Sequence, residues 1–167
     1  RTPQMSSVSC LTDIDDPLVL DASVVVNLNA TGYADRVLDA IPAGVFIPDS
    51  VVKELQRGIK MGHSDATDLN ELLSQGLADT LKVPTSAQSE YIALVSGSSS
   101  SSLGDGEAAT IASAYVMRAW AGIDERKARR VCRDRYKSVK VASTLDILAH
   151  PDVLASFSED EFSSALL

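Results

Sequence analysis

The stretch Pro17-Leu-Val-Leu-Asp21-Ala-Ser23-Val-Val-Val-Asn-Leu28 decides how the rest of the chain is interpreted. Its first apolar run, Leu18–Leu20, has the length of a short buried strand and ends at a carboxylate. A small residue and a hydroxyl follow, and a second apolar run, Val24–Val26, then continues into a helix. The stretch therefore predicts a strand, a turn and a helix, with Asp21 at the carboxyl end of the strand. In an open α/β sheet, ligands bind at that edge.

Short apolar runs of this kind recur along the chain and alternate with helical patterns. We expect strands at residues 18–20, 44–48, 81–83, 119–123 and 140–144. We expect helices at residues 23–30, 34–41, 51–57, 64–75, 87–95, 106–114, 126–135, 145–149 and 159–167. This alternation predicts an α/β fold of three layers, in which helices cover both faces of a central parallel sheet of four or five strands.

Glycine and proline set most of the expected boundaries between these elements. Gly58 is expected to end the helix at 51–57, and Pro151 is expected to stop the helix at 145–149. No glycine or proline precedes the strand at 119–123, so its start is the least defined of the boundaries.

Length and composition indicate one intracellular domain. The 167 residues predict a single domain over residues 17–167 that follows a flexible lead-in over residues 1–16. No apolar run approaches the roughly 20 residues of a membrane span, and no signal peptide is visible. Cys10 and Cys132 lie far apart, outside any metal-binding pattern, which favours reduced thiols in a cytoplasmic protein.

Two segments have a strongly biased composition. Eight of the fifteen basic residues fall between Arg126 and Lys140, although the whole chain has a net charge of −8. A basic stripe on an acidic body indicates local contact with a polyanion, and a solvated helix face is the alternative. The run of residues 96–102, Ser-Gly-Ser-Ser-Ser-Ser-Ser, predicts a mobile loop that serves as a plain linker.

Acidic residues stand at the start of four expected elements. They are Asp21, Glu54, Glu107 and Asp124, with Asp105 beside Glu107. If the strands are parallel, these side chains can converge on one edge of the sheet, where they would repel one another unless a cation lay between them. Ligation by oxygen alone, without nearby Cys or His, is typical of Mg²⁺ or Mn²⁺.

Each of these acids also has a purely structural interpretation. Asp21 could cap the helix that follows it, and Asp124 could be a turn residue or a helix cap. Glu54 could be an exposed helix residue, and Asp105 and Glu107 could satisfy the amides at a helix N-terminus.

Five motifs in this order resemble the PIN domain family, in particular its small prokaryotic members. The motifs are Val19-Leu-Asp21-Ala-Ser23 with Asn27-Leu28, Ile47-Pro-Asp-Ser-Val-Val-Lys-Glu54-Leu, Leu103-Gly-Asp-Gly-Glu107-Ala, Gly122-Ile-Asp124-Glu125-Arg126-Lys-Ala-Arg129, and Val141-Ala-Ser143-Thr144-Leu145-Asp-Ile-Leu148. The resemblance covers residues 18–149. It departs from the family at Thr110, where many relatives carry a further acid, and at Ala142-Ser143, where relatives often have glycine.

The resemblance implies a metal-dependent endoribonuclease that leaves a 5′-phosphate and a 3′-hydroxyl. Asp21, Glu54, Glu107 and Asp124 would hold Mg²⁺ or Mn²⁺, with Asp105 as the alternative third ligand, and Ser23 would orient an acid or a water. The residues of the basic helix would bind RNA: Arg126, Lys127, Arg129 and Arg130. The resemblance also implies a homodimer and a role as the toxin of a toxin–antitoxin pair, silenced by a small antitoxin protein.

Other functions fit the residues less well. A phosphatase with an Asp nucleophile usually needs a second Asp two residues later, where this chain has Ser23. A phosphorylated receiver domain would need an additional acid pair and a late lysine. A PIN-like module that binds RNA or a protein partner without cleavage is the main alternative.

Overall fold

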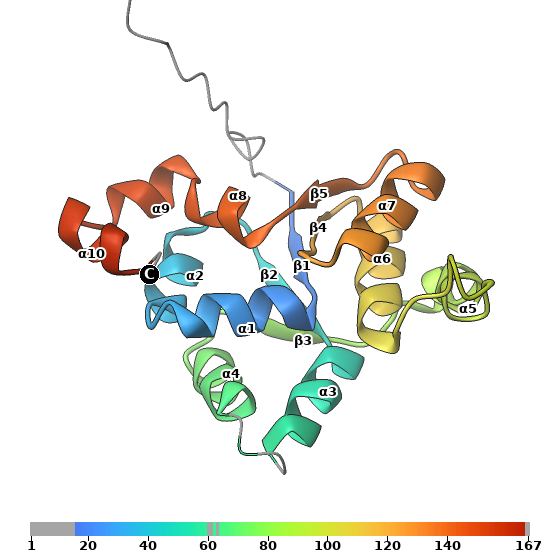
Figure 1. Cartoon of the computed structure of the whole chain (residues 1–167), viewed down its shortest axis with the longest axis horizontal. Helices are drawn as coiled ribbons and strands as arrows, with labels where there is room; N and C mark the ends of the chain where they lie inside the picture. The colour runs from blue at the N-terminus through green and yellow to red at the C-terminus, as the bar shows by residue number, and fades with distance from the viewer. Residues whose placement is uncertain (1–15, 60–61, 63, 166–167) are drawn as a thin grey trace, which may run out of the picture.

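The computed structural model describes residues 16–59, 62 and 64–165, and its centre is a five-stranded parallel sheet. The strands lie in the order β3-β2-β1-β4-β5 (Figure 1). Their bounds are β1 Leu18–Leu20, β2 Val45–Pro48, β3 Asp79–Leu81, β4 Trp120–Gly122 and β5 Lys140–Ala142. The predicted α/β fold with an all-parallel sheet is confirmed.

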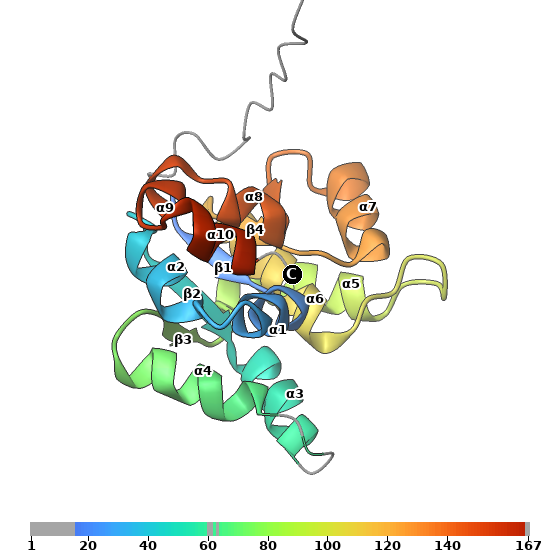
Figure 2. The ribbon, with the colours of Figure 1, turned by 60° about the vertical axis from the view of Figure 1, so that its left-hand side comes forward.

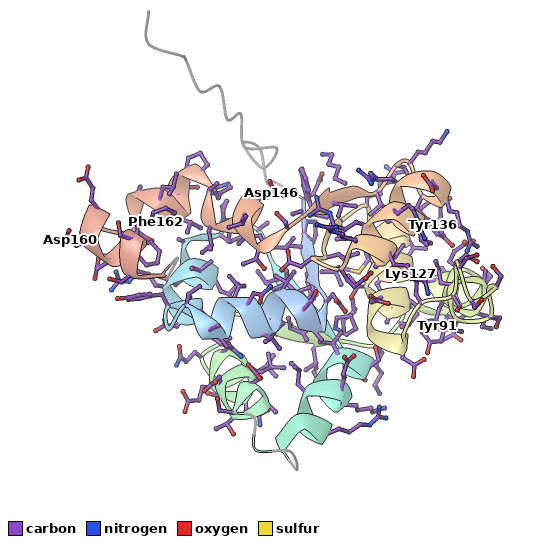
Figure 3. All side chains as sticks on the ribbon, viewed as in Figure 1. Tyr91, Lys127, Tyr136, Asp146, Asp160 and Phe162 are labelled. Atoms are coloured by element: carbon purple, nitrogen blue, oxygen red, sulfur yellow. The ribbon has the colours of Figure 1, made fainter. Side chains whose placement is uncertain are left out.

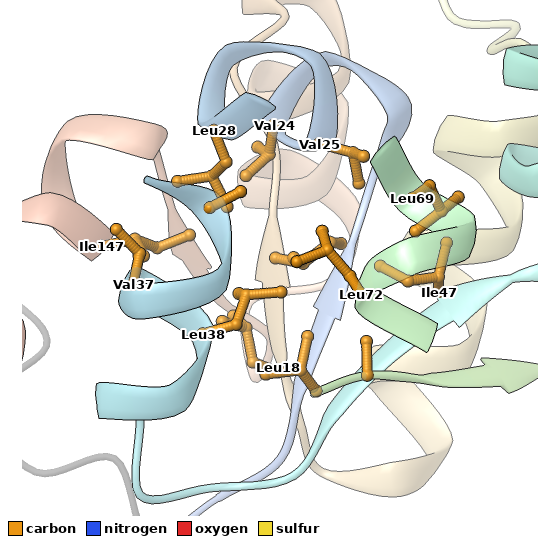
Figure 4. Close-up of a cluster of buried hydrophobic side chains, with 14 of the residues drawn as sticks. Leu18, Val24, Val25, Leu28, Val37, Leu38, Ile47, Leu69, Leu72 and Ile147 are labelled. Carbon is orange, nitrogen blue, oxygen red and sulfur yellow. The ribbon is translucent and has the colours of Figure 1, made fainter. Parts of the chain in front are cut away.

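Helices cover both faces of this sheet. Successive side chains of β1 point to opposite faces, so this strand contributes to a hydrophobic core on each side. Leu18 and Leu20 belong to one hydrophobic core, shown in part in Figure 4, and Val19 belongs to the other. The first core is formed with α1 Ala22–Ala30, α2 Ala34–Ala40, α3 Asp49–Ile59, α4 Asp65–Ser74, α8 Thr144–Leu148 and α9 Pro151–Ala155. The second is formed with η1 Thr85–Ala87, α5 Gln88–Val95, α6 Asp105–Met117 and α7 Arg126–Arg135. Figure 2 shows this separation from another side.

The path of the chain reverses around β1. From β1 the chain passes to β2 and β3 on one side, and α5 and α6 then carry it back to β4 on the other side. In parallel sheets, such a reversal opens a crevice beyond the carboxyl ends of the two adjacent strands. The end of β1 and the end of β4 are therefore the expected place for a site.

A close approach between β1 and β4 supports the floor of this crevice. Gly122 pairs with Leu20, and a Cβ atom on Gly122 would lie 2.5 Å from Cδ2 of Leu20. Glycine at this position lets the fully buried Leu20 pack directly below the carboxyl end of the strand.

Several expected boundaries differ from the structure. Gly58 does not end a helix, because α3 continues to Ile59, and β3 lies two residues earlier than predicted, at Asp79–Leu81. α6 continues to Met117, beyond the predicted end at residue 114. The helix before Pro151 does stop as predicted, and Pro151 also begins α9, since proline fits the first turn of a helix, where its missing N–H is not needed.

The C-terminal helix α10, Glu159–Ala165, is joined to α2 by an ion pair. Arg36 pairs with Glu161 at 2.9 Å and stacks on the ring of Phe157, which itself meets Tyr33 edge to face.

Of the predicted lead-in, residues 1–15 lie outside the described residues, and Asp16 pairs with Lys140 at 3.1 Å. Among the described residues, no helix combines the length and the apolar character needed to cross a membrane.

Replacement of Arg118 by glycine is expected to stabilise the protein. Arg118 ends α6 with a left-handed backbone, at a φ of 55°, where a Cβ atom is strained. We expect Arg118→Gly to raise the free energy of unfolding by about 0.5–1 kcal/mol in urea titrations, because glycine removes that strain. Arg118→Ala keeps the Cβ atom and is the control. Equal stability of the two variants would contradict a backbone origin.

Candidate functional site

A cleft of about 650 Å³ lies at the crevice beyond β1 and β4. Its walls come from α1, from α3, from the first residue of α4, from the start of α6 and from the residue that precedes α7. Five carboxylates line it, those of Asp21, Glu54, Asp65, Glu107 and Glu125. Ser23, Asn27, Gly104 and Gly106 also line it. The sheet topology thus brings together acids that are more than 80 residues apart in sequence.

Asp21 is the most deeply buried of these acids, with 3% of its surface exposed. The Ser23 hydroxyl donates to its Oδ2 atom at 2.8 Å, and Asp21 also stands at the N-cap of α1. Burial raises the pKa of Asp21, and the nearby charge of Asp124 raises it further. The N-cap interpretation is confirmed, but the cap leaves the carboxylate at the base of the cleft.

Glu54 reaches the cleft from α3 and meets Asp21 above Gly106. A Cβ atom on Gly106 would lie 2.9 Å from Glu54 Oε2 and 3.3 Å from Asp21 Oδ1. The absent side chain therefore leaves a small space with an oxygen of each acid on its edge. Burial raises the pKa of Glu54, and the charges of Asp21 and Asp105 act in the same direction, although Arg57 opposes them.

Glu107 and Asp105 take different positions at the start of α6. Glu107 lines the cleft and accepts the backbone N–H of Gly104 at 3.0 Å, whereas Asp105 is exposed and accepts the hydroxyl of Tyr91 at 3.2 Å. Burial raises the pKa of Glu107, and Asp21 and Glu125 raise it further. Glu107 thus bonds to the helix N-terminus, as its structural interpretation predicts, and it also faces the cleft.

Asp124 is fixed by donors from two other parts of the chain. The Asn27 amide donates to its Oδ2 atom at 2.7 Å, and Thr144 donates its backbone N–H to Oδ1 at 2.8 Å and its hydroxyl to Oδ2. The Ser23 hydroxyl accepts the backbone N–H of Asp124 at 3.4 Å, which joins the ends of β1 and β4. The cap of α7 is not Asp124 but Glu125, which accepts the N–H of Ala128.

Three residues that contribute to this site were not among the site residues predicted from the sequence. Asn27 and Thr144 hold Asp124, and Glu125 lines the cleft. Asn27 lies almost one hundred residues from Asp124 in sequence, so no local pattern joins the two. For Glu125, the signal was its place directly after Asp124 at the end of a strand.

The donor set of the cleft suits a hard divalent cation. Among the residues that the structure describes, no three acidic, His or Cys side chains stand at the spacing of a ready-made metal site. Glu107 and Asp124 are instead engaged by hydrogen-bond donors. Asp21 and Glu54 nevertheless present oxygens to the space above Gly106, and the repulsion between them would be relieved by a cation. The residues therefore fit such an ion.

The basic helix α7 borders the same edge of the sheet. Its buried face is formed by Ala128, Val131 and Cys132, and burial raises the pKa of the Cys132 thiol to about 11. The four predicted RNA-binding residues, Arg126, Lys127, Arg129 and Arg130, are exposed or half-buried on the remaining faces. The helix is therefore amphipathic, with its positive charge accessible beside an acidic cleft.

A protein-family model described as the PIN domain matches residues 17–152, from the start of β1 into α9. The chain belongs to the PIN domain family. PIN domains are generally nucleases and typically use divalent metal ions. Asp124 and all the carboxylates that line the cleft lie within the matched residues. No curated protein and no solved structure matches the chain significantly.

The burial of Asp21 predicts a pH-dependent cost to the stability of this PIN domain without metal. Because the folded pKa of Asp21 is raised above its ordinary value of 3.8, its contribution to stability is full below that value and is lost as the pH rises through the folded pKa. We expect Asp21→Asn, measured by thermal melts in chelator, to be more stable than wild type at pH 7. The difference should vanish below pH 3.8.

Asparagine can still cap α1, so the comparison isolates the charge. The matched control is Asp134→Asn, because Asp134 is an exposed residue of α7. If the melting temperatures of Asp21→Asn and wild type differ by the same amount at every pH, that result would contradict the raised pKa of Asp21.

A double-mutant cycle tests how Thr144 holds Asp124. Thr144→Val removes one charge-assisted hydrogen bond and keeps the shape of the side chain, so we expect a loss of about 1–2 kcal/mol in unfolding free energy. In an Asp124→Asn background, most of this loss should disappear, because the charge is gone. Thr144→Ser retains the hydroxyl and serves as the control. Equal losses in both backgrounds would show that Thr144 acts independently of the carboxylate.

Proposed function

We propose that this PIN domain is a divalent-metal-dependent endoribonuclease that hydrolyses phosphodiester bonds of RNA. The observation that carries the proposal is the meeting of Asp21, Glu54 and Glu107 in one cleft at the topological switch point, with Asp124 against its edge. Burial raises the pKa of three of these carboxylates, and their mutual repulsion raises it further. A site that concentrates negative charge in this way would attract a cation.

We assign the ligands of Mg²⁺ or Mn²⁺ to Asp21, Glu54, Glu107 and Asp124. Asp105 is the weaker candidate for the third position, because Asp105 is bonded to Tyr91 and Glu107 lines the cleft. Such an ion supplies a Lewis acid that lowers the pKa of water and offsets the charge on the phosphate oxygens.

The remaining residues of the cleft have positioning roles in this proposal. The Ser23 hydroxyl orients Asp21 and joins it to the backbone of Asp124. Asn27 and Thr144 keep the Asp124 carboxylate at the rim. Fixed donors of this kind hold ligands in place without a large reorganisation when the substrate binds.

The substrate would be held by the basic helix. Arg126, Lys127, Arg129 and Arg130 lie on the accessible faces of α7, and their charges complement an RNA backbone. The rest of this acidic chain would repel RNA, so binding would concentrate at this helix.

The small prokaryotic members that the sequence resembles suggest a biological setting. Following them, we propose a cytoplasmic toxin of a toxin–antitoxin pair that forms a homodimer and is silenced by a small antitoxin. Cleavage of cellular RNA would be harmful if it were not restrained, which is the physical reason to expect an inhibitory partner.

Cleavage of RNA tests the proposed reaction. We expect a mixed pool of structured and single-stranded RNA to be cut with Mg²⁺ or Mn²⁺ and to stay intact in chelator. Asp21→Asn and Asp124→Asn should each reduce the cleavage rate about 100-fold or more, because a ligand is lost. Thr144→Val should reduce it about 10- to 100-fold, as expected for a residue that orients a ligand.

The control is again Asp134→Asn, which should cut RNA at the wild-type rate. Absence of cleavage together with absence of thermal stabilisation by Mn²⁺ would overturn the proposal and favour a PIN-like module that binds RNA or a protein partner without cleavage. Full activity of Asp21→Asn or Asp124→Asn would contradict the role of that residue.

A further inference from the structure

The serine-rich segment between α5 and α6, residues 96–102, has a defined shape; we call it the serine loop. The hydroxyl of Ser98 lies 3.0 Å from the hydroxyls of both Ser100 and Ser101, and the backbone N–H groups of Ser101 and Ser102 donate to the Ser98 carbonyl. A Cβ atom on Gly97 would lie 2.8 Å from Ser101 Oγ, so glycine lets the loop close on itself. The loop therefore gathers three hydroxyl groups at one exposed point.

Two cations of α7 bind the backbone of this loop. Lys127 donates its ammonium to the Ser99 carbonyl at 3.1 Å, and Arg130 donates its guanidinium to the Ser100 carbonyl at 3.2 Å. An ammonium has three N–H donors and a guanidinium has five, so each retains donors beyond its bond to the loop. Hydroxyl groups and positive charges thus meet in one place. Lys127 is labelled among the side chains in Figure 3.

This meeting point adjoins the cleft. The loop leads directly through Leu103 into Gly104, which lines the cleft, and Leu103 is anchored by its N–H on the Leu94 carbonyl at 3.0 Å. The charge of Lys127 also reaches Glu107, where it favours the ionised carboxylate. Lys127 therefore interacts with both the serine loop and one acid of the cleft.

We propose that the serine loop and α7 form one binding site for the RNA backbone, in which the hydroxyls of Ser98, Ser100 and Ser101 donate to phosphate oxygens beside Lys127 and Arg130. The inference rests on the proposed ribonuclease function and names the residues that hold the strand next to the cleft. Serine hydroxyls and basic side chains are common donors to phosphate groups, and they fix the register of a strand without reading its bases.

The bonds between the loop and α7 favour this site over a plain linker. A linker would need no contact with the cations of a neighbouring helix, whereas a backbone site needs its donors fixed before the strand arrives. The carbonyls of Ser99 and Ser100 are engaged by α7, and Ser98 and Ser100 are exposed. Ser101 is half-buried, and its hydroxyl donates to the Ser98 carbonyl at 3.3 Å, a bond that it would exchange for one to a phosphate oxygen. The phosphate backbone is the ligand whose charge suits this combination.

The experiment measures RNA affinity in an Asp21→Asn background, in which cleavage is silenced. The probe is a fluorescently labelled single-stranded RNA oligonucleotide, followed by anisotropy with Mg²⁺ at several salt concentrations. We expect the triple variant Ser98→Ala, Ser100→Ala, Ser101→Ala to bind about tenfold more weakly, because it loses hydrogen bonds to charged phosphates. Lys127→Ala and Arg130→Ala should each lower the slope of log affinity against log salt by about 0.7.

The matched control removes three serine hydroxyls elsewhere. Ser74, Ser163 and Ser164 donate to carbonyls of their own helices, so their combined replacement by alanine should change RNA affinity less than about twofold. In the cleaving protein, the loop variant should raise KM and leave kcat nearly unchanged, because the loop does not contact the carboxylates. A structural defect would instead lower the melting temperature.

Two outcomes would overturn the inference and leave the proposed function intact. Unchanged affinity of the loop variant would make the loop a linker, and increased affinity would mean that the loop occupies the path of the RNA. If the protein with an intact loop neither binds nor cuts RNA, the proposed function itself fails, and the loop variants are not needed to show it.

Discussion

The mutual repulsion of carboxylates at the ends of β1 and β4 is the constraint on which the rest of this structure depends. Asp21 lies at its centre: it is buried, its pKa is raised by burial and by Asp124, and its own charge raises the pKa of Glu54 and Glu107. The surrounding framework holds these acids together against that repulsion through the bonds of Ser23 and Thr144 and the close packing of Gly122 on Leu20. Holding these carboxylates together lowers the stability of the fold. Such a loss of stability is common where a site requires an unfavourable arrangement of charges.

The fold could be predicted from the sequence wherever burial is strong. The runs around β1, β2 and β4 are apolar because both faces of these strands are covered, and their positions were predicted to within one residue at most ends. Edge strand β3 was misplaced because Asp79 and Thr80 are exposed and give no apolar signal. The end of α6 was predicted three residues too early, since its C-cap is an arginine in the left-handed conformation and not a glycine.

The convergence of Asp21, Glu54 and Glu107 on one edge of the sheet could also be predicted, because parallel strands bring the residues at their carboxyl ends together. The residues that hydrogen-bond to Asp124 could not be predicted from the sequence. Asn27 and Thr144 contact Asp124 only after β1, β4 and β5 have aligned, and no spacing in the sequence encodes that alignment. The same holds for the serine loop, whose composition indicates a linker and whose contacts with Lys127 and Arg130 appear only in three dimensions.

The place of Thr144 in the chain has a consequence for biosynthesis. A ribosome makes Asp21, Glu54, Glu107 and Asp124 first, and the strand and helix that carry Thr144 emerge only afterwards. A nascent or truncated chain that ends before Thr144 would carry every acid of the cleft and lack two of the donors that fix Asp124. Completion of the site is therefore tied to completion of the sheet, and a cell would meet the assembled cleft only when nearly the whole domain has been made.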